Sequence, residues 1–314
     1  MLKLIASRLL GLVVTLLVSS LLVFGALALV PGDPIVALSG GRTLSPVARQ
    51  ALIDRYHLAD PVVVRYVRWL GDVVTGDLGQ SFVFKSEVTS LIGARLLTTV
   101  MLVAMASVLI VVLGVGSGVL AGTRGGRVDT GVMFATVIAQ AIPSFVAAVA
   151  LVAVFAVRLP WFPPIGSGDG LTDRLHHLVL PAISLALGQT AYVARVSRAA
   201  ILAEFDREHV ETAFARGLPW RTVVRRHVLR NAMIPIITVA GLTIAGLIAT
   251  TVVVERAFSL NGIGSLLVEA IARKDFAVVQ AVALLLVAVF VVVNTSVDLV
   301  YRLIDPRLDR KGRP

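Results

Sequence analysis

Cysteine is absent from this chain of 314 residues, and charged residues make up only 15% of it. The absence of cysteine excludes a disulfide framework and any metal site built from thiolates. The shortage of charge argues against a soluble domain, because such domains carry roughly 25% charged residues. The composition therefore indicates a membrane protein.

Sequence patterns of common catalytic and metal sites are also missing. A nucleotide-binding loop needs Gly-Lys before serine or threonine, because backbone N–H groups and that lysine hold the phosphates. The four lysines instead follow Leu, Phe, Arg and Arg, at Lys3, Lys85, Lys274 and Lys311. The five histidines form no H-x-x-x-H pair, and Ser117 lacks the frame of a nucleophile elbow. We therefore expect no catalytic, cofactor or metal residues here, and any energy must come from a partner or an ion gradient.

Apolar residues, by contrast, make up 57% of the chain and gather in six long blocks. Each has about 20 residues or more, the length that a helix needs to cross a hydrocarbon core of about 30 Å. Backbone polar groups in lipid must be satisfied internally, so the blocks are expected to be helical. The prediction is an all-α membrane protein with six transmembrane helices at about 9–30, 96–121, 132–157, 179–200, 233–254 and 277–301.

The net charge of +10 could indicate nucleic-acid binding, but its distribution argues for a topology signal instead. With six spans, 17 cations lie on the side of the two termini, and eight of these flank or occupy the 201–232 loop. Five lie in the two short loops opposite, and seven lie in the long 31–95 segment, which counts for little. We therefore expect both termini and the 201–232 loop to be cytoplasmic, in a multi-pass protein of the cell (inner) membrane, with no nucleic-acid partner.

These assignments divide the chain into four parts. They are an N-terminal transmembrane helix at 1–30, an extracytoplasmic segment at 31–95, a five-helix transmembrane core at 96–301 with the cytoplasmic loop at about 201–232, and a cytoplasmic tail at 302–314. The first block follows Lys3 and Arg8 as a signal peptide would, but its length exceeds the roughly 7–15 apolar residues of such a peptide.

The extracytoplasmic segment contains two expected helices. Ser45 and Pro46 have the types favoured at a helix start. Residues 62–74 carry a broad apolar face. That face either lies on the membrane surface, with Tyr66 and Trp69 at the interface, or packs as a small cap on its own core.

Small and polar residues inside the spans give further expectations. Gly114, Gly118 and Gly122 recur at every fourth position, which allows a neighbouring helix to approach closely. Pro143 removes a backbone hydrogen bond in the third span and predicts a kink.

Four polar residues in the spans are candidates for a translocation path. Gln140 and Ser144 flank the kink on one helix face, and Gln189 and Tyr192 share a face of the fourth span. Such residues either line a water-filled path or form hydrogen bonds between helices, and the sequence leaves both open.

The loop at 201–232 contains an amphipathic helix, expected at about 207–216. Gly217 fits the left-handed position that closes a helix. Glu208 and Glu211 lie on its polar face, whereas Val210, Ala213 and Phe214 lie on its apolar face. Without further information, the helix could be an ordinary connector on the lipid surface.

Several segments resemble one known family along nearly the whole chain. They are LLVFGALALVPGDPI at 21–35, HLADPVVVRYVRWLGDVVTGDLGQSF at 57–82, IPSF at 142–145, HLVLPAISLALGQTAYVARVSRA at 177–199, VVVERAFSLNGIGSLLVEAI at 252–271 and NTSVDLVYRLIDPRL at 294–308. The chain resembles the B-type permease subunits of ATP-binding-cassette importers for dipeptides, oligopeptides and nickel.

The coupling motif of these importers also has a counterpart in this chain. It maps onto Glu211, Thr212, Ala213 and Gly217. Thr212 departs from it, and His227 and Arg230 replace its later isoleucine and proline.

The resemblance implies a type I importer permease fold and a set of partners. These are a homologous second permease, two ATPase subunits or domains, an extracytoplasmic solute-binding protein and membrane lipid, with ATP and Mg²⁺ in the partner subunits. The residues expected to contact the ATPase are Arg207, Glu208, Glu211, Ala213, Phe214 and Gly217. The solute would be a peptide, with nickel or another small solute as the alternative. A gradient-driven secondary transporter is a further alternative, but no inverted repeat is evident.

Overall fold

The computed structural model describes residues 2–29, 45–56, 59–81 and 83–304, and these are helical almost throughout. They belong to two compact units. One unit comprises residues 1–99 and 261–291, and the other comprises residues 100–260 and 292–314. The predicted tail at 302–314 lies mostly outside the described residues.

The first unit contains the long N-terminal helix, most of a second long helix, shorter helices and a two-stranded sheet. Its elements are α1 (Leu2–Ala28), α3 (Pro46–Tyr56), α4 (Val62–Thr75), β1 (Gln80–Ser81), β2 (Ser86–Glu87), the start of α5 (Val88–Leu109), α13 (Ile263–Ala272) and most of α14 (Phe276–Ile304). The strands are antiparallel, with Gln80 opposite Glu87. The core joins α5, α13 and α14 through residues such as Val88, Leu266 and Val282.

The two helices expected between residues 45 and 75 are confirmed. Helix α3 begins at Pro46, and Ser45 Oγ accepts a hydrogen bond from the backbone N–H of Ala48 at 3.2 Å. On α4, Tyr66 and Trp69 pack against Phe24 of α1, with ring centroids 5.5 and 5.6 Å from that ring. The aromatic face of α4 therefore packs on a long apolar helix and not on a separate core of the cap.

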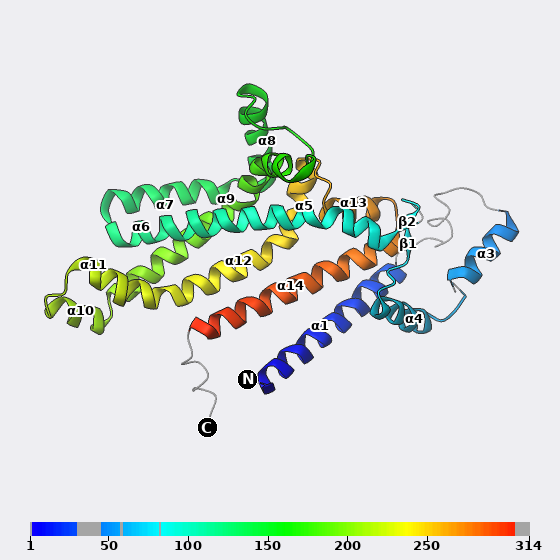
Figure 1. The fold of residues 1–314 in the computed structure, drawn as a ribbon, viewed down its shortest axis with the longest axis horizontal. Helices are drawn as coiled ribbons and strands as arrows, with labels where there is room; N and C mark the ends of the chain where they lie inside the picture. Colours follow the sequence, from blue (N-terminus) through cyan, green and yellow to red (C-terminus); the bar gives the residue numbers. More distant parts are fainter. Residues whose placement is uncertain (1, 30–44, 57–58, 82, 305–314) are drawn as a thin grey trace. The chain divides into compact units, whose positions relative to one another are not determined.

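The second unit is built around one long central helix. Its elements are the rest of α5, α6 (Gly116–Arg124), α7 (Gly126–Ala141), α8 (Ser144–Leu151), α9 (Gly170–Phe205), α10 (Glu208–Ala215), α11 (Trp220–Val223) and α12 (Leu229–Ala257). Wider π-helical turns occupy Ile110–Val115, Val152–Arg158 and Val224–Val228. Helix α9 packs against α6, α7, α8 and α12, and Figure 1 shows α6 and α7 beside it.

Among the residues that the structure describes, five helices are long and apolar enough to cross a membrane, and the number is six if one bent pair counts as a single span. That pair is α7 with α8 and its π-helical continuation, bent by 98° at residues 142–143. The sequence prediction of one continuous face holding Gln140 and Ser144 was therefore wrong. Pro143 ends one helix, so Gln140 lies near the end of α7 and Ser144 begins α8.

Several helix bounds and one short helix differ from the sequence prediction. Helix α5 begins at Val88, earlier than the expected span start at about 96. Helix α13 lies in a stretch that was expected to be a loop. Its ten residues are too few to cross a membrane. A search for apolar blocks of about 20 residues therefore does not find this helix.

Candidate functional site

Helix α10 is a short helix between α9 and α11. It runs over Glu208–Ala215, one residue shorter at each end than expected, a difference within the usual uncertainty of helix ends. The left-handed conformation predicted for Gly217 is confirmed by its φ of 73°. The backbone N–H of Gly217 donates to the carbonyl of Phe214 at 2.9 Å, which closes the helix end.

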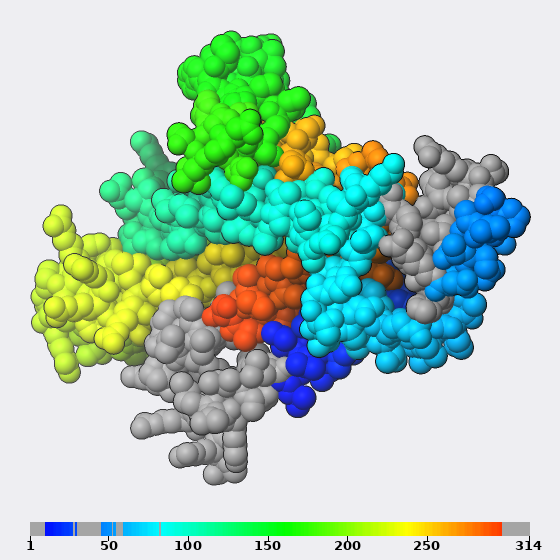
Figure 2. Space-filling view, turned by 45° about the vertical axis from the view of Figure 1, so that its right-hand side comes forward, coloured from blue at the N-terminus to red at the C-terminus, as the bar shows by residue number. Residues whose placement is uncertain are grey.

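One face of α10 is packed and the other is exposed. Val210 and Ala213 are buried in a cluster with residues of α9 and α12, among them Ile201 and Ile236. The exposed members of the predicted contact set are Arg207, Glu208, Glu211, Phe214 and Gly217. Ala213 was predicted to contact a partner, but its side chain packs inward and holds the helix in place. The segment around α10 and α11 lies at the surface, at the left edge of Figure 2.

A second group of polar residues lies along α9. Gln189, Tyr192 and Arg195 are three residues apart and therefore neighbours on the helix surface. The side chain of Tyr192 is 42% exposed, although Ala191, Val193 and Ala194 around it are buried. Arg195 donates to Oε1 of Gln140 at the end of α7. The structure thus brings Gln140 next to the face of Gln189 and Tyr192.

Ser144 is placed differently from the other three candidates for a path. Its carbonyl oxygen accepts a hydrogen bond from Oγ of Ser184 on α9 at 2.7 Å. Because Pro143 breaks the helix at this point, the bond ties the first residue of α8 to the central helix. The contact is made by the backbone of Ser144 and does not involve its side chain.

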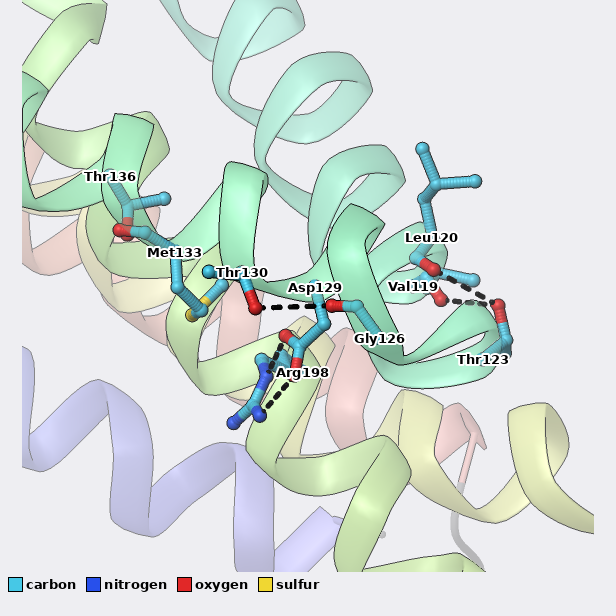
Figure 3. Close-up of polar contacts among 9 residues, drawn as sticks. All are labelled: Val119, Leu120, Thr123, Gly126, Asp129, Thr130, Met133, Thr136 and Arg198. Carbon is cyan, nitrogen blue, oxygen red and sulfur yellow. Dashed lines mark hydrogen bonds and ion pairs between the residues drawn. The ribbon is translucent and has the colours of Figure 1, made fainter.

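Arg198, on the turn of α9 that follows Arg195, forms an ion pair with Asp129 in the first turn of α7. Figure 3 shows the guanidinium group meeting the carboxylate through two bonds, from Nε to Oδ1 and from Nη2 to Oδ2, the latter at 2.5 Å. A bidentate pair of this kind fixes both distance and orientation. It joins α7 to α9 beside the Gly125 turn that connects α6 and α7.

Comparison with known families gives this arrangement a context. The family model for the binding-protein-dependent transport system inner membrane component matches residues 110–310, and the model for the N-terminal region of such membrane components matches residues 1–103. The chain belongs to this family. It is a multi-span membrane permease of an ABC importer, a class that works with ATPase and other partner components.

Related proteins cover almost the whole permease. The oligopeptide transport system permease protein AppB of Bacillus subtilis is 35% identical over 297 residues, covering 92% of this chain and 94% of that protein. A putative peptide transport system permease protein of Brucella abortus is 36% identical over 312 residues, covering 98% and 99%. A chain from an inward-facing structure of the MetNI methionine ABC transporter has the same fold, with a TM-score of 0.57, 20% identity and coverage of 69% of this chain and 97% of that one.

Two features around α10 were not predicted from the sequence of the permease. The first is an aromatic stack, in which the ring of Trp220 lies 5.2 Å from Phe205 and 5.7 Å from Phe214, nearly parallel to both. Trp220 is 51% exposed, so the stack continues the surface of α10. Its sequence signal was the aromatic residue directly after Pro219, at the start of the next helix.

The second feature is a polar cluster of Glu204, His209 and Asn231. Nε2 of His209 lies 3.1 Å from Oε1 of Glu204, and Nδ2 of Asn231 donates to that same oxygen at 2.9 Å. Asn231 also donates to the carbonyl of His227 at 3.0 Å. The cluster links α10 to the end of α9 and the start of α12.

Proposed function

We propose that this permease forms half of the translocation pathway of an ATP-driven importer for peptides. The observation that carries the proposal is identity of 35–36% over more than nine-tenths of the chain to permeases named for oligopeptide or peptide transport. The pathway would be completed by a homologous second permease. Nickel or another small solute is the alternative cargo.

The exposed face of α10 is the proposed contact with an ATPase subunit. It offers two carboxylates, Glu208 and Glu211, beside the aromatic surface of Phe214. The two ATPase subunits or domains would bind ATP and Mg²⁺, and this chain would contribute no catalytic residue. An extracytoplasmic binding protein would deliver the solute from the opposite side of the membrane.

The proposed mechanism is alternating access driven by closure of the ATPase pair. Closure would carry α10 along, and the buried Val210 and Ala213 with the Glu204–His209–Asn231 cluster would pass the movement to α9 and α12. To shift a population from 1:99 to 99:1, closure must favour the outward state by about 5.5 kcal/mol. The buried contacts and the polar cluster attach α10 firmly enough to α9 and α12 to transmit such a movement.

The proposed path runs along the exposed face of α9. Gln189 and Tyr192 lie on this face, and Gln140 is brought to it through Arg195. Ser144 borders it through the bend between α7 and α8. Neutral polar groups suit a path for peptides, because they hydrogen-bond a peptide backbone without retaining it.

Uptake by proteoliposomes tests the function. The full complex, with its ATPase subunits and binding protein, is expected to accumulate radiolabelled tripeptides when ATP is present and to leave nickel ions outside. ATP-dependent nickel uptake without peptide uptake would establish the alternative cargo. Peptide uptake that follows an ion gradient and ignores ATP would contradict the proposal.

Labelling of single cysteines tests the orientation, and the lack of native cysteine leaves this chain without background. Cysteines at the exposed Ser45 and Ser259 are expected to react with a membrane-impermeant thiol reagent in intact cells. Cysteines at Arg216 and Thr222 are expected to react only after the cells are opened, because the cationic 201–232 loop is proposed to be cytoplasmic. Labelling of a cysteine at position 216 in intact cells would contradict the proposed orientation.

A further inference from the structure

Two arginines of α9 lie three residues apart and have different partners. Arg198 is paired with the carboxylate of Asp129 through two bonds. Arg195 donates to the neutral amide oxygen of Gln140, and no carboxylate pairs with it among the residues that the structure describes. The positive charge of Arg198 is therefore balanced by a carboxylate within the protein, whereas the positive charge of Arg195 is not.

The charge of Arg195 borders the exposed stripe of α9. The stripe contains Tyr192, Ala199 and Ala203, all of them exposed, on a helix whose other sides pack against α6, α7, α8 and α12. A charged side chain in a membrane helix is costly when it faces lipid and usually faces a bundle interior or water. The stripe is therefore better suited to water or a partner subunit than to lipid.

The geometry points to Arg195 as an anion site in the translocation path, which binds the C-terminal carboxylate of a peptide in transit. This inference rests on the proposed function. A guanidinium group has five N–H donors, of which the contact with Gln140 uses one, so donors remain for a two-bond contact with a carboxylate. Gln140 is neutral, so a carboxylate can replace it without displacing another charge.

The C-terminal carboxylate is a group that all free peptides carry, whatever their side chains. A site for it guides many sequences along one path and requires no pocket for any single side chain. Tyr192 and Gln189, next to Arg195 on α9, add neutral polar groups that can meet the peptide backbone. The same positive charge repels bare divalent cations, which separates peptide from nickel as cargo.

The first test compares tripeptides as free acids and as C-terminal amides, in proteoliposomes that hold the full complex. The binding protein is the same throughout, so its own preference cancels when ratios are compared between variants. Arg195→Gln is expected to lower the acid-to-amide uptake ratio by about tenfold, the scale of a lost hydrogen bond to a charged group. Arg195→Lys keeps the charge and is expected to retain part of the ratio.

Arg198→Gln is the matched control one turn away. It breaks the pair with Asp129 and is expected to lower the amount of stable permease while leaving the acid-to-amide ratio unchanged. An equal fall of acid and amide uptake in Arg195→Gln would make Arg195 structural and overturn the assignment. Absence of ATP-driven uptake of either form by the wild type would refute the proposed function itself, and with it this site.

The second test needs no transported solute. A single cysteine replaces Tyr192, and its reaction rates with an anionic and a cationic methanethiosulfonate reagent of similar size are compared in the assembled complex. The anionic reagent is expected to gain several-fold over the cationic one when Arg195 is present, because a nearby unpaired charge attracts it. Adding Arg195→Gln is expected to remove this preference. An unchanged rate ratio would overturn the anion site.

Discussion

In thermal unfolding of the purified permease, Gly118→Ala is expected to destabilise the protein by about 1–3 kcal/mol, the usual cost of overpacking a tight contact. A Cβ at Gly118 would lie 2.5 Å from Cβ of Ser197 and against the carbonyl oxygen of Ala194, both on α9. Neither neighbour is the flexible end of a long side chain. The helices α6 and α9 must therefore move apart, and dispersion contacts along their interface are lost.

Gly116→Ala is the matched control in the same helix. A Cβ at Gly116 meets nothing within 4 Å, and its replacement is expected to be neutral or stabilising by up to about 1 kcal/mol, because glycine is a poor helix former. Gly122 and Gly114 should rank between the two, since their nearest contacts would be 2.8 and 3.1 Å. Equal melting of Gly118→Ala and Gly116→Ala would show that α6 and α9 do not pack this closely.

The close approach of α6 to α9 illustrates how far the sequence leads. The spacing of Gly114, Gly118 and Gly122 predicts that another helix packs closely there, but it does not identify the partner. The length and apolarity of the blocks likewise predict the spans, because a membrane imposes both. The 98° bend at residues 142–143 exceeds the kink expected from Pro143. The Ser144 carbonyl beside this bend accepts a hydrogen bond from Ser184 of α9, a tertiary contact that no local pattern reveals.

The candidate site was predictable in its local parts and not in its long-range ones. Gly217 was found because a left-handed helix end favours glycine. The cluster of Glu204, His209 and Asn231 was not found, since its members come from three helices and carry no spacing signal. Arg195 was only one of the eight cations in and beside the 201–232 loop that indicated the topology. Its contact with Gln140 depends on how α7 and α9 pack.

Reversal of one charge on α10 is the second prediction with a large expected effect. Glu211→Lys is expected to lower ATP-driven uptake by at least about tenfold, because losing one member of an interfacial charge pair costs about 2–5 kcal/mol. Glu211 is exposed in the first turn of α10, so the change leaves the packed face intact. A lysine there is unfavourable to the helix dipole by only about 0.3–1 kcal/mol, and the buried Val210 and Ala213 hold the helix in place.

Three measurements on the purified complex separate a coupling defect from a folding defect. With Glu211→Lys, the permease is expected to melt as the wild type does, to retain less ATPase subunit during purification, and to lose solute-stimulated ATP hydrolysis together with uptake. Glu211→Gln, which removes the charge without reversing it, should give uptake between that of the wild type and that of Glu211→Lys. Glu87→Lys makes the same charge change at an exposed position of β2 and should leave uptake unchanged. Wild-type uptake and ATPase retention with Glu211→Lys would mean that the exposed face of α10 does not bind the ATPase, because a two-unit change of charge cannot be silent at the centre of a contact that transmits force.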